Sequence, residues 1–231
     1  MRYFRLNRYA SHTPHTLHTP RPKGSCYLIL RSICLLVFAV LTGCKSYYHN
    51  LQQSEGDVNC IKSFTPNFTN TLYSAYIDVT KHHFSGILFF KLMPDSSMRI
   101  VFTNEMGVKF FDFAFTKDGS FTRYYVLSKM DKKVVVRALR NDLQLVLLHP
   151  DLSKASVLKD SSYSYIKVPT KKGNNYYITE NCKKLIRIEK ASKRKPVVAV
   201  QMLNYKDGIP DSINIEHKNF KFNIALKHTE R

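Results

Sequence analysis

A short apolar run that ends at a cysteine constrains this chain more than any other feature. Residues 33–41 are all apolar, and the sequence L-T-G-C then ends at Cys44. The run is too short to cross a bilayer as a helix, which needs about 20 apolar residues, and Arg31 interrupts any extension toward the N-terminus. The preceding segment carries six Lys or Arg and no acidic residue. A basic segment followed by a short apolar core is typical of a secretory signal peptide.

The sequence at 41–44 resembles the lipobox of bacterial lipoproteins. This resemblance implies that residues 1–43 are a signal peptide with a long basic n-region, and that Cys44 becomes an acylated N-terminus. Two or more acyl chains give a stable anchor, whereas one gives only marginal binding. The resemblance then implies a protein of the cell envelope, lipid-anchored in the outer membrane and facing the periplasm. An uncleaved membrane anchor and a soluble core segment are the alternatives.

The charge of the chain indicates an anionic neighbour. The formal net charge is +19, and the 188 residues from Cys44 onward keep +13. Such an excess favours an anionic lipid surface or nucleic acid as a partner. Export and the lack of any nucleic-acid-binding motif argue against nucleic acid. The basic run at 183–195 is interpreted as a solvated face, or alternatively as a supplement to membrane binding.

Two further cysteines remain beyond the lipidation site. Cys60 and Cys182 form an even pair in an oxidising compartment, which makes them disulfide candidates. Two free buried thiols are the alternative. Neither cysteine has a second Cys or a His at ligand spacing, so no metal site is expected.

Residues 44–57 are polar and are interpreted as a lipidated tether, followed by one β domain over 58–231. Alternating apolar residues and turn signals predict about eleven strands with short connections. This pattern predicts a mainly β fold of antiparallel strands, either a curved half-barrel or a closed barrel. The predicted strands are 72–80, 84–92, 98–103, 107–115, 121–128, 163–168, 175–179, 184–189, 197–204, 212–217 and 219–227.

One amphipathic helix is predicted over 132–148. Its polar residues recur at helical spacing, and an apolar stripe lines the other side. Asp131 is the expected N-cap, and Pro150 ends the helix. We expect this helix to lie across a face of the sheet, although a docking role is an alternative.

Three stretches carry a second resemblance: the strand pair at 73–92, Met106-Gly107 before an aromatic strand, and I-P-D-S-I-N-I at 209–215. Their ordering looks like the LolA/LolB-type fold, and the chain is similar to uncharacterised outer-membrane lipoproteins of Bacteroidetes. The resemblance implies a single curved antiparallel sheet, a half-barrel, with one packed amphipathic helix. It also implies a ligand such as a lipid or the acyl chain of a lipoprotein.

Six phenylalanines are the candidates for lining such a lipid cavity. The alternative is that they only pack the sheet against its helix. They sit on both faces of neighbouring predicted strands: Phe89, Phe90, Phe110, Phe111, Phe113 and Phe115.

Catalytic motifs are absent from the sequence. There is no Gly-x-Ser-x-Gly elbow, phosphate-binding glycine loop or His-Glu-x-x-His motif. His82 and His83 are adjacent and are expected to be solvated at a hairpin, so no catalytic or metal role and no cofactor is assigned. The sequence therefore predicts a non-enzymatic, membrane-anchored lipoprotein that binds an apolar ligand or acyl chain in a curved sheet. A tethered interaction subunit of an envelope complex without a lipid cavity is the main alternative, and a hydrolase is a third class.

Overall fold

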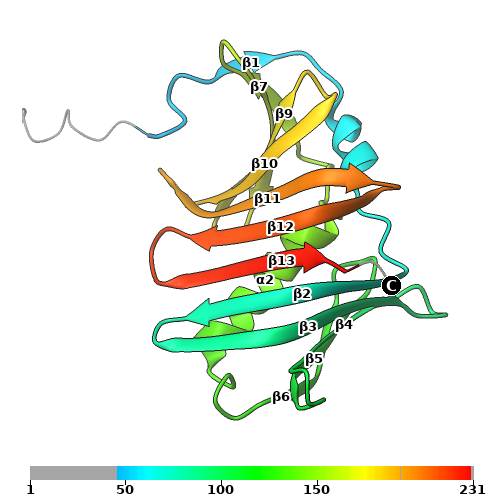
Figure 1. Cartoon of the computed structure of the whole chain (residues 1–231). Coiled ribbons are helices and arrows are strands. Elements are labelled where there is room, and N and C mark those ends of the chain that lie inside the picture. Colours follow the sequence, from blue (N-terminus) through cyan, green and yellow to red (C-terminus); the bar gives the residue numbers. More distant parts are fainter. Residues whose placement is uncertain (1–45, 193, 230–231) are drawn as a thin grey trace, which may run out of the picture. The chain divides into compact units, whose positions relative to one another are not determined.

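The computed structural model describes residues 46–192 and 194–229 (Figure 1). Cys44 and the predicted signal peptide lie outside these ranges. In chain order the elements are β1 (Gln52–Ser54), the 3₁₀ helix η1 (Val58–Phe64), β2 (Asn70–Val79), β3 (His82–Leu92), β4 (Met98–Thr103), β5 (Lys109–Phe115), β6 (Phe121–Val126), α2 (Lys133–Leu147), β7 (Ser156–Lys159), β8 (Ser164–Thr170), β9 (Gly173–Glu180), β10 (Lys184–Ala191), β11 (Pro196–Lys206), β12 (Ile209–His217) and β13 (Phe222–His228).

The thirteen strands form one sheet in which every neighbouring pair is antiparallel. Strands β1 and β6 are its two edges, so the sheet is not closed into a barrel. The predicted mainly β class, a single antiparallel sheet with one packed helix, is confirmed. The sequence allowed either a half-barrel or a closed barrel, and the structure has the sheet that does not close.

The sheet consists of two runs of consecutive strands that meet at its centre. Strands β2 to β6 form one run and β7 to β13 the other, and β1 is added at the outer edge of β7. The last strand, β13, pairs with β2, and Ile224 lies opposite Ile77. Both side chains are buried. Strands from near the two ends of the described chain thus pair near the middle of the sheet (Figure 1).

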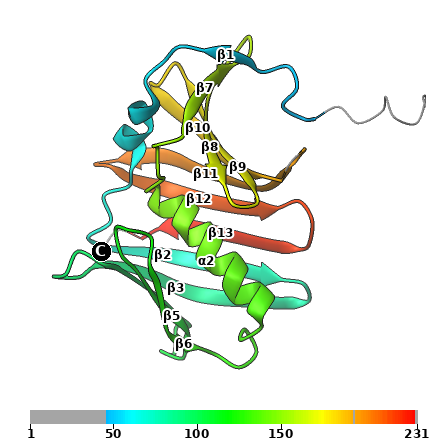
Figure 2. The same ribbon diagram turned by 180° about the vertical axis from the view of Figure 1, so that it is seen from behind.

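Helix α2 carries the chain from one end of the sheet to the other. It follows the edge strand β6 and leads into β7, which lies beside the opposite edge strand. The connection therefore has to cross a face of the sheet, and Figure 2 shows the helix lying across it. The apolar stripe of the helix, which includes Leu139, Leu143 and Val146, is buried against that face. This burial is the main stabilisation of the helix, because helices of this length are marginal by themselves.

The start of α2 differs from the prediction. The N-cap position is Lys132, which makes no side-chain capping bond. The carboxylate of Asp131, the expected cap, instead pairs with the guanidinium of Arg123, 2.5 Å away. At the other end, Leu148 takes a left-handed conformation with φ 54°, and Pro150 follows two residues later.

All eleven predicted strands are present, with ends shifted by a few residues. Prediction missed β1, β7 and η1, because elements of three, four and seven residues show too few repeats for a periodicity to stand out. Of these elements, β1 lies in the segment that was expected to be a tether. Over its described part, residues 46–57, the segment packs on the sheet: β1 pairs with β7, and the Tyr48 ring stacks on Tyr176 at 3.9 Å. Tyr48 and Leu51 supply the apolar contacts that a composition argument overlooked.

Candidate functional site

The six candidate phenylalanines lie mainly inside the core between helix and sheet. Phe90, Phe111 and Phe113 have no exposed surface, and Phe115 retains 2%. Phe89 and Phe110 are half-buried. The five rings other than Phe89 each pack on another aromatic ring; the Phe111 and Phe113 rings stack at 4.6 Å. Among the six, Phe115 also reaches the groove described next.

A groove opens between the second half of α2 and strands β8 to β10, on the face of the sheet that carries the helix. We name it the helix-side groove. It encloses about 510 Å³, within the roughly 300–1,000 Å³ typical of small-molecule sites. Its lining comes from the end of β5, from α2 and the residues after it, and from β8, β9, the turn between them and β10: Phe115, Thr116, Gly119, Arg137, Asn141, Gln144, Leu145, Leu147, His149, Pro150, Asp151, Val168, Pro169, Thr170, Lys171, Lys172, Asn175, Tyr177 and Lys190.

The floor of the helix-side groove is apolar. Phe115, Leu145, Leu147, Val168 and Tyr177 are each more than nine-tenths buried. They come from four separate elements, so the sheet and the helix together build the floor. Burial raises the pKa of the Tyr177 hydroxyl above its ordinary value. An alkyl chain could replace water against such a floor, at about 25 cal/mol per Å² of apolar area buried.

The rim of the groove is basic. Arg137, Lys171 and Lys172 are exposed at its mouth, and Lys190 is half-buried at its side. Asp151 is the one carboxylate among the lining residues. Burial lowers the pKa of Lys190, and Lys172 adds to that effect, although Asp142 opposes it. An anionic group at the mouth would relieve the mutual repulsion of these cations.

A buried polar pair lies behind the floor. Asp142 of α2 is fully buried, and its Oδ2 accepts a hydrogen bond from His217 Nε2 of β12 at 2.7 Å. Asp142 Oδ1 has no hydrogen-bond partner in the structure. Burial raises the pKa of Asp142, while the bond from His217 and the charge of Lys190 act in the opposite direction. The pair ties α2 to the sheet beside the groove, a contact that no local sequence pattern indicated.

The cysteine pair named from the sequence is joined in the structure. Cys60 in η1 and Cys182 in the turn after β9 form a disulfide with Cα atoms 5.7 Å apart. The bond fastens η1 to the far end of the sheet.

The basic run at 183–195 does not form one surface in the structure. Lys190 lines the helix-side groove, and Arg187 Nε donates to Glu189 at 2.7 Å on the opposite face of the sheet. Lys193 lies outside the described residues. The run is thus divided between two faces, because alternate residues of a strand point in opposite directions.

His82 and His83 lie at a hairpin, as the sequence predicted. His82 and His83 begin β3, and both are exposed. His83 Nδ1 lies 2.5 Å from Asp78 Oδ1 on the neighbouring strand. Among the described residues, no group of three or more His, Cys, Asp or Glu side chains could hold a metal ion. The described part of the chain also holds no helix long and apolar enough to cross a membrane.

Comparisons with known proteins yielded distant structural likenesses. No protein-family model and no curated protein matches the sequence. A LolA superfamily protein from Nitrosomonas europaea aligns with 75% of this chain and 90% of its own, at 8% identity and a TM-score of 0.44. An outer membrane lipoprotein-sorting protein domain from Vibrio parahaemolyticus aligns over the same shares, at 8% identity and a TM-score of 0.43. At these values the likenesses do not identify a ligand or an activity.

Proposed function

We propose that this chain is a non-enzymatic lipoprotein that binds an amphiphile in the helix-side groove. The apolar part of the ligand, an alkyl or acyl chain, would lie on the floor around Leu145, Val168 and Tyr177. Its anionic end would sit at the basic rim. The combination of a buried apolar floor and a cationic mouth in one groove of about 510 Å³ carries this proposal.

The proposed anchor is the acylated Cys44. The L-T-G-C sequence supports it, and so does the short apolar run before it. An anchored protein would then work at an anionic membrane surface of the cell envelope, in the outer membrane and facing the periplasm. The net charge of +13 from Cys44 onward favours that surface.

Displacement of a fluorescent fatty acid tests the ligand. The full chain carrying Cys44→Ser, which removes the proposed acylation site, is titrated with dansyl-undecanoic acid and then with palmitate or hexadecanol. We expect palmitate to displace the probe at lower concentration than the uncharged alcohol, because the rim attracts the carboxylate. No binding of the probe would refute the proposal.

A charge reversal locates the site. Lys171→Glu combined with Lys172→Glu should weaken palmitate binding about tenfold, which corresponds to about 1.4 kcal/mol. The same reversal at Lys183 and Lys184, two exposed adjacent lysines outside the groove, is the matched control and should leave binding unchanged. Equal loss in both double variants would mean a general charge effect and no specific rim.

The second candidate function is that of an interaction subunit, and the edge strand β6 favours it. Within the described residues, β6 pairs on one side alone, and Tyr124 and Tyr125 are 59% and 42% exposed. An exposed edge can accept a strand from a partner protein. The apolar face of α2, by contrast, is buried against the sheet. Cross-linking in membranes tests this alternative: one dominant protein partner cross-linked through β6 favours it.

A further inference from the structure

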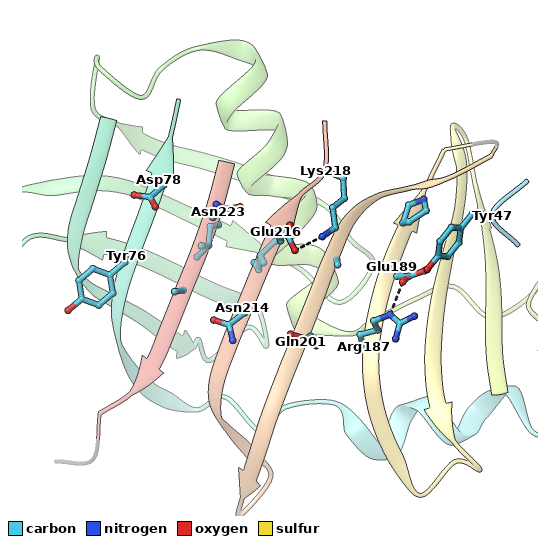
Figure 3. A pocket seen from close by; sticks show the side chains of 15 residues that line it. Tyr47, Tyr76, Asp78, Arg187, Glu189, Gln201, Asn214, Glu216, Lys218 and Asn223 are labelled. Atoms are coloured by element: carbon cyan, nitrogen blue, oxygen red, sulfur yellow. Dashed lines mark hydrogen bonds and ion pairs between the residues drawn. The ribbon is translucent and has the colours of Figure 1, made fainter. Parts of the chain in front are cut away.

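The face of the sheet opposite α2 carries a second concave site, which we name the polar hollow (Figure 3). It encloses about 560 Å³. Strands β10, β11, β12, β13 and β2 form its base, and the segment before β1 closes one side. Its polar or aromatic lining residues are Tyr47, Tyr76, Asp78, Arg187, Glu189, Gln201, Asn214, Glu216, Lys218 and Asn223.

The hollow exists because small residues stand at two positions of its base. Across the strands, Gln201 lies opposite Asn214, Asn214 opposite Ala225, and Ala225 opposite Tyr76. In the adjacent row, Ala199 lies between Glu189 and Glu216. Each alanine has larger side chains on both neighbouring strands, so the protein surface is lower at the alanine than on either side of it. The depression is thus built by the pairing register of the strands.

The charged groups of the hollow already have partners in the protein. Glu189 accepts hydrogen bonds from Arg187 Nε at 2.7 Å and from the Tyr48 hydroxyl at 2.6 Å. Lys218 pairs with Glu216, and Asp78 with His83. The three carboxylates of the lining slightly outnumber its two cations, although the chain as a whole carries +19. A small charged ligand would have to displace one of these pairs.

The amide side chains of the hollow, by contrast, have no hydrogen-bond partner among the described residues. Gln201, Asn214 and Asn223 are exposed, and their side chains make no hydrogen bond to any other described residue. Each amide offers two N–H donors and one carbonyl acceptor. Figure 3 shows the three amides between Tyr76 on one side and Tyr47 on the other. Both tyrosines are 60% exposed. Such rings present an apolar face together with a hydroxyl.

We propose that the polar hollow binds a neutral oligosaccharide. The hydroxyls of a sugar donate and accept hydrogen bonds at short intervals, which matches a row of free amides. The C–H faces of its rings are apolar and suit an exposed tyrosine at each end. The hollow also exposes carbon atoms of Pro196, Ala199 and Ala225, which the C–H faces of sugar rings can contact, and an anion finds no unpaired cation among the described lining residues. This inference is independent of the helix-side groove, which lies on the other face of the sheet.

Two arms of one experiment test the ligand and its source. The full chain carrying Cys44→Ser is titrated calorimetrically with chitotriose and with maltotriose as free glycans. In the second arm, it is sedimented with phosphatidylcholine vesicles, with and without the neutral glycolipid digalactosyldiacylglycerol. Binding to a free trisaccharide indicates a glycan polymer as the source, and binding confined to the glycolipid vesicles indicates a membrane glycolipid.

Substitutions in the hollow decide whether it is the site. Tyr76→Ala removes one ring, and Ala225→Phe fills the base; each should weaken binding about tenfold or more. Tyr124→Ala is the matched control, since Tyr124 is 59% exposed on β6 and lies outside the hollow. Circular dichroism checks that each variant folds. If Ala225→Phe does not fold, Asn214→Ala, a change at an exposed position, takes its place.

The result that supports the proposal is binding in either arm that both hollow variants weaken and Tyr124→Ala does not. Two results overturn it. One is the absence of binding in both arms up to millimolar glycan. The other is binding that persists unchanged in the hollow variants. A failure of fatty-acid binding in the helix-side groove leaves these outcomes unaffected, so the two proposals fail separately.

Discussion

Loss of the disulfide should lower the stability of the domain more than any single surface change. Cys60 and Cys182 are 122 residues apart in sequence, so the bond closes a loop that contains β2 to β9 and α2. In the chain-entropy treatment, a closure of that length restricts the unfolded chain by about 16 cal/mol/K, or about 5 kcal/mol at 25 °C. We therefore expect Cys60→Ser combined with Cys182→Ser to reduce the free energy of unfolding by about 3–5 kcal/mol.

Urea unfolding followed by circular dichroism measures this loss. With a slope of roughly 2 kcal/mol/M, the midpoint should fall by about 1.5–2.5 M urea. Reducing agent should lower the midpoint of the parent chain by the same amount and leave the double variant unchanged, which excludes effects at the other cysteines. The reasoning is refuted if the oxidised and reduced parent chains unfold at the same urea concentration, or if the double variant still responds to reductant.

Two further predictions concern the core and the sheet. Because burial raises the pKa of Asp142, the stability that its protonated form contributes is present below about pH 4 and is lost as the pH rises through the higher folded value. Asp142→Asn keeps an acceptor for His217, so the stability of this variant relative to the parent chain should increase from pH 4 to pH 8. A constant difference between the urea midpoints of the two proteins across that range would contradict this. Gly86→Ala should destabilise by about 2 kcal/mol or more, because a Cβ there would lie 2.0 Å from the Thr103 backbone oxygen. Gly107→Ala is the comparison: its φ of +81° strains an alanine by about 1 kcal/mol, but a Cβ there meets nothing within 4 Å. A melting temperature no lower for Gly86→Ala than for Gly107→Ala would refute the clash.

The sequence predicted the local elements well and their assembly poorly. Alternation over 219–227 predicts that Phe220, Phe222, Ile224 and Leu226 share one face. The last three are buried, whereas Phe220 lies before β13 and is 38% exposed. Nothing local indicated that β13 would pair with β2, because that contact joins opposite ends of the domain. The sequence also did not predict β1, because three residues show no periodicity and its partner β7 comes only after α2 in the chain.

For the candidate site too, the sequence predicted local features but not which elements come together. Four of the six aromatic residues chosen from the sequence lie in the core, Phe110 packs against it, and Phe115 alone among the six lines the helix-side groove. The rest of that groove comes from α2 and from the turn between β8 and β9, where Lys171 and Lys172 read as ordinary turn residues. Periodicity identifies which face of an element is apolar. It does not say which elements border the same opening.

The central position of the last strand has a consequence for how the chain is completed. Because synthesis proceeds from the N-terminus, β13 is made after the other strands of the sheet, and the two runs of strands cannot pair with each other before it is made. Contacts between such distant segments form slowly. Deleting β13 would therefore divide this sheet near its middle. In a sheet whose last strand lies at an edge, the same deletion would remove only an edge strand.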